Sequence, residues 1–235
     1  MEVKKISIIV PAYNEEHRLP DFINSLRDYC LNNRNFIWEV IVVNDGSYDN
    51  TEKIIEKISR EFNPLIGLSH EENMGKGAAI KTGVKNASGD IIIFIDADES
   101  TSPKEIDKMI KVLERADVGI GYRIHRKSKI IIKQPIKRIL AGKIFNLVVN
   151  LILDLKIYDT LCGFKGLHAE YKNIILNCET NRWSFDVEML YLAKKYHLKI
   201  EKIPIVWKHA EGSKISLLKD PIEMVIELIK IRIRK

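Results

Sequence analysis

The 235-residue chain has little cysteine and no long apolar run, and both absences restrict what it can be. Cys30, Cys162 and Cys178 are widely spaced and form no Cys-x-x-Cys pair, which argues against a disulfide framework or a zinc knuckle. The six histidines form no His-Glu-x-x-His motif, so a zinc enzyme of that type is not indicated. No apolar run reaches the roughly 18 to 20 residues that a transmembrane helix needs, and no signal-peptide pattern opens the sequence. We therefore expect a cytosolic protein.

Acidic residues are missing from a long central segment, although the chain as a whole is an ordinary mixture with a net charge of +6. Residues 118–153 contain no Asp or Glu. The cations in this segment are Arg123, Arg126, Lys127, Lys129, Lys133, Lys137, Arg138 and Lys143. A local excess of one sign indicates a polyanionic ligand or an anionic membrane surface rather than general solubility. A second basic group, Lys230, Arg232, Arg234 and Lys235, ends the sequence.

Strand and helix patterns alternate through the first half of the chain. Period-two and apolar runs predict strands at 6–10, 38–43 and 90–95, and 3.6-residue periodicity predicts helices at 19–31, 51–62 and 77–86. Further on, the sequence predicts a strand at 117–121 and a helix at 136–155. Repeated strand–helix units form mostly parallel sheets flanked by helices, so the fold class is α/β.

Polar turns follow three of these strands, at 11–16, 44–47 and 96–98. The carboxyl ends of parallel strands meet at one edge of a sheet, where open α/β sheets bind their ligands. Asp96 and Asp98 stand two residues apart after a buried strand, so both are expected to point to the same side. Paired carboxylates at such a position indicate Mg²⁺ or Mn²⁺ bound together with phosphate oxygens.

Gly75-Lys76-Gly77 precedes the helix at 77–86 but matches neither a Walker loop nor a dinucleotide fingerprint. A helix N-terminus with glycine at its entrance suits an anion, and a plain tight turn is the alternative.

Two helices have a pattern that suits a membrane surface. The helix at 136–155 is apolar around more than half of its circumference and has one polar stripe, Lys143, Asn146 and Asn150. The last helix begins at Asp220-Pro221 and places Ile222, Val225, Ile226, Ile229 and Ile233 on one face, with the terminal cations around its end. Both could lie in a bilayer interface or pack as ordinary helices against the protein or a second copy.

Several motifs, taken together in order and spacing, carry a family resemblance. The first four are Val10-Pro11-Ala12-Tyr13-Asn14-Glu15, Val43-Asn44-Asp45-Gly46-Ser47, Asn73-Met74-Gly75-Lys76-Gly77 and Asp96-Ala97-Asp98. They resemble glycosyltransferase family 2. The remaining four are Gly121-Tyr122-Arg123, the run 159–165, the run Arg182-Trp183-Ser184-Phe185-Asp186-Val187-Glu188, and Glu211-Gly212-Ser213-Lys214. These resemble the dolichyl-phosphate glucose and mannose synthases, the glucose branch more closely.

The resemblance implies a GT-A fold, with one catalytic domain at 1–219 and an amphipathic basic helix at 220–235. Residues 1–117 would form the nucleotide-sugar half and 118–219 the acceptor half. It further implies inverting transfer of a hexose from a nucleotide sugar, UDP-glucose before GDP-mannose, to a polyprenyl phosphate. The enzyme would act peripherally on the cytosolic membrane face, either directly or through a membrane-protein partner or a homo-oligomer, and nucleic acid is not expected as a partner.

Residue roles follow from the same resemblance. The residues expected to bind the nucleotide sugar are Pro11, Ala12, Tyr13, Glu15, Val43, Asp45, Lys76, Asp96 and Ala97. Asp96 and Asp98 would hold Mg²⁺ or Mn²⁺, which neutralises the leaving diphosphate. Asp98, Arg123 and Arg138 would act in catalysis, and Arg123, Arg138, Ser213 and Lys214 would bind the acceptor phosphate.

An acceptor phosphate needs no general base at neutral pH, whereas a saccharide hydroxyl would need one. Trp183, Asp186 and Glu188 are expected to support the acceptor site, and Asp186 or Glu188 would be the base if the acceptor were a saccharide. A non-catalytic nucleotide-sugar-binding module is the remaining alternative. Ser100 stands where mannose synthases often carry glutamine, and Lys208 and His209 where they often carry arginine, which weakens mannose as the sugar.

Overall fold

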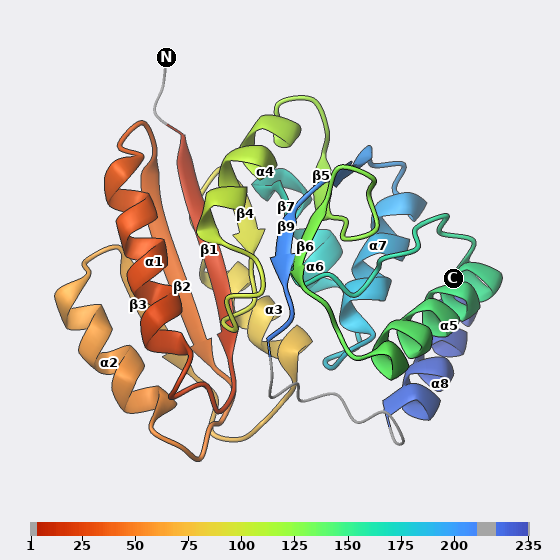
Figure 1. Ribbon diagram of the computed structural model, residues 1–235, viewed down its shortest axis with the longest axis horizontal. Coiled ribbons are helices and arrows are strands. Elements are labelled where there is room, and N and C mark those ends of the chain that lie inside the picture. Colours follow the sequence, from red (N-terminus) through yellow and green to blue (C-terminus); the bar gives the residue numbers. More distant parts are fainter. Residues whose placement is uncertain (1–3, 211–219, 235) are drawn as a thin grey trace.

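The computed structural model describes residues 4–210 and 220–234, with side chains in the second range from residue 223 onward. Within them, seven strands form one sheet in the order β3-β2-β1-β4-β7-β5-β8 (Figure 1). These strands are β1 (Lys5–Ala12), β2 (Ile37–Asn44), β3 (Leu65–Ser69), β4 (Ile91–Phe94), β5 (Val118–Gly121), β7 (Lys165–His168) and β8 (Ile200–Ile203). A second sheet pairs β6 (Lys129–Ile132) with β9 (Val206–Lys208).

The sheet is mostly parallel, as the repeated strand–helix pattern predicts. Parallel pairing joins β1 to β2 and β4, β2 to β3, and β5 to β8. Only β7, of the strands described, runs antiparallel to both of its neighbours, β4 and β5. The central strands are buried on both sides, which explains their continuous Ile and Val runs.

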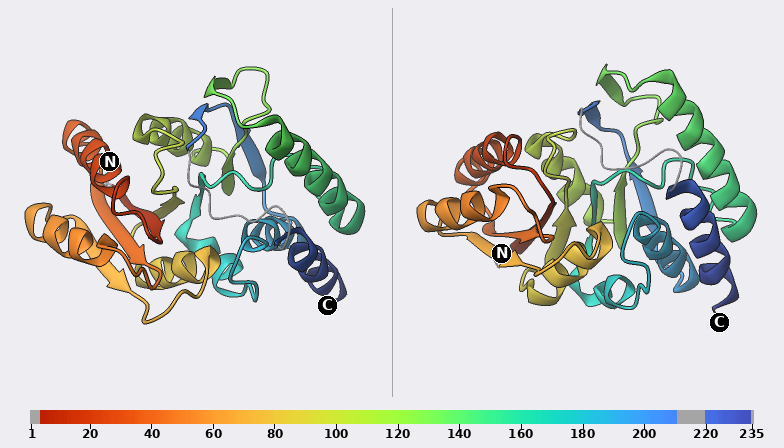
Figure 2. Two further views of the ribbon diagram at one scale, coloured as in Figure 1. Left: turned by 60° about the horizontal axis from the view of Figure 1, so that its bottom comes forward. Right: turned by 90° about the horizontal axis from the view of Figure 1, so that it is seen from below.

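Helices cover both faces of the main sheet. The helices of eight or more residues are α1 (Leu19–Asn32), α2 (Thr51–Glu61), α3 (Lys76–Asn86), α4 (Ile106–Leu113), α5 (Ile136–Leu153), α7 (Phe185–Lys195) and α8 (Asp220–Ile233). The shorter ones are α6 (Asn173–Leu176) and the 3₁₀ turns η1 (Pro103–Glu105) and η2 (Ala169–Tyr171). Residues of α1, α2 and α4 share one apolar core, and those of α3, α6 and α7 share the other with α5 and α8. Figure 2 shows α8 beside α5 at one end of the molecule.

The predicted elements form close to their expected bounds, and the structure adds others. The sequence did not indicate β3, β6, β7, β8, β9, α4, α6 or α7. Among the described residues, no helix is both long and apolar enough to cross a bilayer.

Helix α5 turns Asn146 and Asn150 of its predicted polar stripe toward the protein, whereas Lys143 is exposed and the apolar stripe faces outward. Asn146 is buried, and its Oδ1 accepts hydrogen bonds from the backbone N–H and the hydroxyl of Thr160, at 3.0 and 2.9 Å. Asn150 bonds both backbone groups of Ile157. The outward residues are Ile136, Leu140, Ile144, Leu147 and Leu151, between 54 and 76% exposed. Asn146 and Asn150 therefore hold the segment that follows the helix, instead of facing water.

Helix α8 packs on the protein through a face other than the predicted one. Met224, Leu228 and Ile231 are buried, and Leu228 and Ile231 belong to the second core. Of the predicted face, Ile226, Ile229 and Ile233 are exposed, and the side chain of Ile222 lies outside the described residues. The guanidinium of Arg234 pairs with Glu179 at 2.7 Å and Glu188 at 3.3 Å, so it is not an outward-facing cation.

Candidate active site

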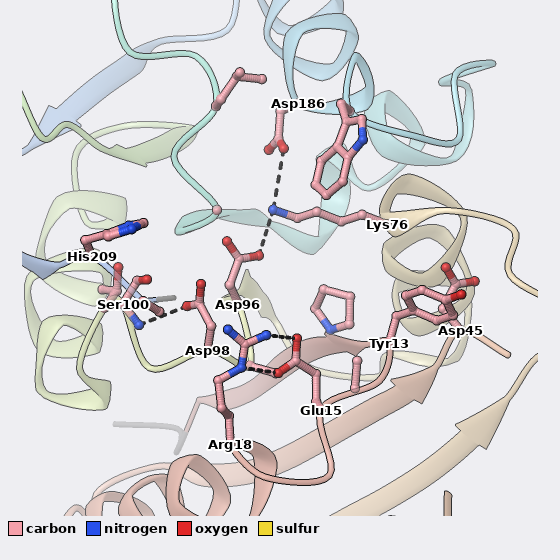
Figure 3. A pocket seen from close by; sticks show the side chains of 18 of the residues that line it. Tyr13, Glu15, Arg18, Asp45, Lys76, Asp96, Asp98, Ser100, Asp186 and His209 are labelled. Carbon is pink, nitrogen blue, oxygen red and sulfur yellow. Dashed lines mark hydrogen bonds and ion pairs between the residues drawn. The ribbon is translucent and has the colours of Figure 1, made fainter. Parts of the chain in front are cut away.

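A cavity of about 350 Å³ opens at the carboxyl ends of β1, β2 and β4. Segments far apart in the sequence meet there (Figure 3), as the position of the predicted polar turns requires. Thirteen of the predicted site residues line it: Pro11, Ala12, Tyr13, Glu15, Asp45, Lys76, Asp96, Ala97, Asp98, Arg123, Arg138, Trp183 and Asp186. The fold therefore brings most of the predicted site residues together around one cavity.

Two of the predicted residues do not line the cavity, and two others cannot be placed in it or outside it. Val43 is fully buried in the core, because its side chain points to the sheet face that α3 covers, beside Gly83. Glu188 is buried elsewhere, where its carboxylate accepts the N–H groups of Glu179 and Thr180. Neither side chain lines the cavity, so Val43 does not contact a ligand there through its side chain, and the supporting role of Glu188 stays a prediction. Ser213 and Lys214 lie outside the described residues.

Asp96 and Asp98 stand side by side in the cavity (Figure 3). Asp98 Oδ1 accepts the backbone N–H of Ser100 at 2.9 Å. Burial and the nearby charge of Asp96 raise the pKa of Asp98 above its ordinary value. In the described part of the chain no cluster of three His, Cys, Asp or Glu surrounds them. The two carboxylates fit a Mg²⁺ or Mn²⁺ ion whose remaining ligands come from phosphate and water.

Lys76, at the start of α3, lies between two carboxylates. Its Nζ is 2.7 Å from Asp96 Oδ1 and 3.6 Å from Asp186 Oδ2. Burial by itself would lower the pKa of Lys76, but Asp186 and Asp96 outweigh it and raise that pKa. Lys76 is therefore a permanent cation beside the predicted metal ligands.

Asp186 enters the cavity from the first turn of α7 and also pairs with Lys165 of β7. Burial alone would raise the pKa of Asp186, but Lys165 and Lys76 together lower it. An acid held ionised by two ammonium groups is a poor general base. This pairing argues against the prediction that Asp186 takes a proton from a saccharide hydroxyl.

Asp45 organises the loop that leads into α3. Its carboxylate accepts hydrogen bonds from His70 Nδ1 at 2.8 Å and Asn73 Nδ2 at 2.8 Å, and from the N–H groups of Met74 at 3.0 Å and Gly75 at 2.8 Å. Gly75 has φ +101°, and a Cβ there would overlap Asn181. The anion at the N-terminus of α3 is thus the carboxylate of Asp45. A nucleobase could hydrogen-bond to Asp45 only by replacing one of these four donors.

Glu15 and Arg18 form a rigid pair beside Asp98. The guanidinium of Arg18 donates Nε–H to Glu15 Oε2 at 2.6 Å and Nη2–H to Oε1 at 2.5 Å, and both residues line the cavity. The positive charge of Arg18 opposes the rise in the pKa of Asp98. Sequence reasoning did not identify Arg18, because it precedes a helix with no motif of its own.

Arg123 and Arg138 line the cavity from the acid-free segment. Arg123 donates through Nε and Nη2 to Asp159, and its Cζ lies 5.2 Å from the ring centroid of Trp207. Burial by itself would lower the pKa of Arg123, but Asp159 outweighs it and raises that pKa. Asp159 therefore fixes the orientation of Arg123. Arg138 lies in the first turn of α5.

Several further cavity residues are not among those to which the sequence analysis assigned a role. They are Arg18, Asn73, Gly75, Ser100, Thr101, Gln134, Leu161, Gly163, Arg182, Trp207, His209 and Ala210. Trp207 reaches the site because an isolated bridge joins it to Thr101, and β9 pairs with β6. Such long-range pairings are not visible in local sequence patterns.

A mostly parallel sheet with a carboxylate pair at its strand ends is the arrangement of the GT-A fold. Glucosyl-3-phosphoglycerate synthase from Mycobacterium tuberculosis, solved with Mn²⁺, UDP and glucosyl-3-phosphoglycerate, has the same fold at a TM-score of 0.70. That likeness covers 97% of this chain and 80% of the other, at 20% identity. The family model for glycosyl transferase family 2 matches residues 7–183, so the protein belongs to this family.

The sequence relatives are more specific. A dolichyl-phosphate beta-glucosyltransferase of Trichomonas vaginalis is 35% identical, with 97% of this chain and 73% of the relative aligned. The dolichyl-phosphate beta-glucosyltransferase of Homo sapiens is 32% identical, with 98% and 76% aligned. The predicted family and fold are confirmed, and the protein is a glycosyltransferase.

Proposed function

We propose that the protein transfers glucose from UDP-glucose to the phosphate of dolichyl phosphate or a similar polyprenyl phosphate, with inversion at the anomeric carbon. The observation that carries the proposal is the arrangement of charge in one cavity. Carboxylates Asp96 and Asp98 suit a metal-bound diphosphate, and Arg123 and Arg138 suit a second phosphate. Relatives named dolichyl-phosphate beta-glucosyltransferase match nearly the whole chain at 30 to 35% identity.

Inversion follows from the chemistry of the proposed substrates. UDP-glucose is an α-glycoside, and the relatives' names specify a β-linked product. A single displacement accounts for this change: a phosphate oxygen of the acceptor attacks the anomeric carbon while the bond to UDP breaks and its electron pair leaves with UDP. GDP-mannose is the alternative donor, and it is disfavoured because Ser100 stands where mannose synthases often carry glutamine.

No residue has to remove a proton from the acceptor. A phosphate oxygen is already ionised at neutral pH, and Asp186, the acid best placed to be a base, is held by Lys76 and Lys165. The site must instead bring the acceptor phosphate close to the donor diphosphate. Arginine side chains favour this approach because they offset the repulsion between the two anions. Mg²⁺ or Mn²⁺ at Asp96 and Asp98 would stabilise negative charge on the leaving diphosphate.

Helix α5 contributes Arg138 to the acceptor side of the cavity and carries an apolar face that points outward. Arg138 lines the cavity, and its neighbours Ile136 and Leu140 are 75 and 54% exposed. Ile131 and Ile132, in β6, are also exposed, and Lys133, Lys137 and Lys143 belong to the same acid-free segment. An exposed apolar face accompanied by cations suits an anionic bilayer.

We accordingly place the protein peripherally on the cytosolic face of a membrane, with α5 toward the lipid. This orientation lets the phosphate of a polyprenyl phosphate reach Arg138 while its hydrocarbon chain remains in the bilayer. A membrane-protein partner or a second copy of the chain would cover the same face without any preference for lipid composition.

The acceptor group can be tested with a matched pair of lipids. Purified protein is given UDP-glucose with Mn²⁺ and either a short polyprenyl phosphate or the polyprenyl alcohol of the same length, and the product anomer is assigned by NMR. We expect a β-linked product from the phosphate alone. Transfer to the alcohol or to a soluble saccharide, or retention of the α configuration, would contradict the proposal.

A further inference from the structure

Lys165 is a fully buried lysine that the proposed reaction does not use directly. Its side chain has no exposed surface, and its ammonium donates to the carbonyl oxygen of Cys162 at 2.6 Å and to Asp186. The ring of Phe94 lies 5.8 Å from the same ammonium. Lysine is almost never fully buried without a specific charged partner, because desolvating the ammonium is costly. A core that only needed volume at this position would carry an apolar residue.

The partner of Lys165 links it to the cavity. Asp186 Oδ1 faces Lys165, and Oδ2 of the same carboxylate lies 3.6 Å from Lys76. Lys76 in turn lies 2.7 Å from Asp96 Oδ1, and Asp96 is more than a third exposed in the cavity. Lys165, Asp186, Lys76 and Asp96 therefore form a chain of alternating charge from the sealed interior to the proposed donor site (Figure 3 shows its three outer members).

We infer that Lys165 is a positioning residue for the donor diphosphate, acting through Asp186 on Lys76; this inference rests on the proposed donor site. Lys76 lies between two carboxylates that compete for it. The charge of Lys165 offsets that of Asp186, so Lys76 stays with Asp96, where its ammonium faces the phosphates of a bound nucleotide. Without Lys165, the buried charge of Asp186 would attract Lys76 inward and away from the donor.

The test compares variants that remove the charge of Lys165 alone with a variant that also removes the opposite charge of Asp186. Lys165→Met removes the ammonium at similar length, and Lys165→Gln removes the charge but can still hydrogen-bond Cys162 and Asp186. The double variant Lys165→Met/Asp186→Asn removes both charges together. Lys81→Met is the matched control, because the ammonium of Lys81 also donates to a backbone carbonyl, that of Cys178, but lies outside the cavity.

Binding of UDP with Mn²⁺ is measured by calorimetry, and the position of Lys76 is read from crystal structures of the variants. We expect both single variants to bind UDP about tenfold more weakly and to show Lys76 displaced from Asp96 toward Asp186. The double variant is expected to bind within threefold of the wild type and to return Lys76 to Asp96. Lys81→Met should bind as the wild type does.

A purely structural role for Lys165 gives another pattern, because the double variant then carries two disruptive changes in the core and should bind UDP most weakly. Single variants that bind UDP normally, or a folded double variant that binds tenfold more weakly, would overturn the inference, whatever happens to the stability of the singles. Wild-type protein that binds no UDP would count against the proposed donor instead. In that case the position of Lys76 in the variant structures still decides the role of Lys165.

Discussion

Gly163 packs against the carboxylate of Asp96 so closely that a Cβ built on Gly163 would overlap Asp96 Oδ2 and Cγ. Gly163 lies just before β7, the strand that runs antiparallel beside β4, and this pairing brings it to the site. The absence of a side chain at Gly163 therefore helps to set the position of a predicted metal ligand.

Gly163→Ala should move Asp96 and lower transfer activity by about a hundredfold, since a displacement of about 1 Å in a catalytic site has an effect of that order. Steady-state transfer kinetics would measure it. Gly142→Ala on α5 is the control, because a Cβ there meets no atom within 4 Å. Equal activity of the two variants would contradict this role of Gly163.

Asp98→Asn should abolish metal-dependent transfer, with a loss of at least about a hundredfold, because one of two anionic metal ligands is removed. Since burial and Asp96 raise the pKa of Asp98, its charge does not stabilise the metal-free fold. The thermal midpoint without metal should stay the same or rise. An active variant, or one that unfolds at a lower temperature without metal, would be inconsistent with a ligand role.

Arg138→Ala should raise the KM for the polyprenyl phosphate about tenfold or more, the effect of losing a charge-assisted contact. Binding of UDP with Mn²⁺, measured by calorimetry, should not change. Lys143→Ala tests the general effect of a cation on the same helix, since Lys143 is exposed and outside the cavity. If both variants alter KM equally, Arg138 has no specific acceptor role.

The outward face of α5 should be required for binding to vesicles. Leu147→Glu/Leu151→Glu should reduce co-sedimentation with anionic liposomes by at least about tenfold, because two large apolar groups would no longer enter the lipid. Leu31→Glu on α1, where Leu31 is 53% exposed, is the matched control. Loss of a dimer in place of lost vesicle binding would assign this face to a second copy.

Glu39 lies at the end of the sheet opposite the site, and it should make the stability of the fold depend on pH. Burial by itself raises the pKa of Glu39, but hydrogen bonds from Lys5, Ser7 and Ser88 outweigh it and lower it to about 2. The folded pKa is depressed, so the charge stabilises the fold above the unfolded pKa, and this contribution is lost as pH falls toward 2.

Glu39→Gln should therefore lose up to about 3 kcal/mol of unfolding free energy at pH 7, and the difference from the wild type should shrink below pH 4. Urea unfolding of both proteins, at pH 7 and at a pH below 4, measures this difference. A difference that does not change with pH would show that the ionised form of Glu39 contributes nothing.

The sequence predicts which residues of the proposed donor half meet in the cavity, because their positions follow directly from strand ends. Asp45 and the Asp96–Asp98 pair come directly after apolar strands, and parallel strands bring such residues to one edge. Val43 shows the limit of this reasoning, since alternation along β2 turns its side chain into the core under α3.

The acceptor half depends on pairings that local patterns do not show. Lys165 meets Asp186 only because β7 inserts antiparallel between β4 and β5. The pattern of α5 indicates two faces but not which one points inward. That choice depends on Asn146 and Asn150, which satisfy buried backbone groups at Ile157 and Thr160.

The central claim is that this cavity transfers glucose from a metal-bound nucleotide sugar to a polyprenyl phosphate. Its most direct test supplies labelled UDP-glucose, GDP-mannose or UDP-N-acetylglucosamine with a short polyprenyl phosphate, in Mn²⁺ and again in chelator. The account predicts one labelled lipid, formed from UDP-glucose and only with metal. Product in chelator, or no lipid product from UDP-glucose, would contradict it.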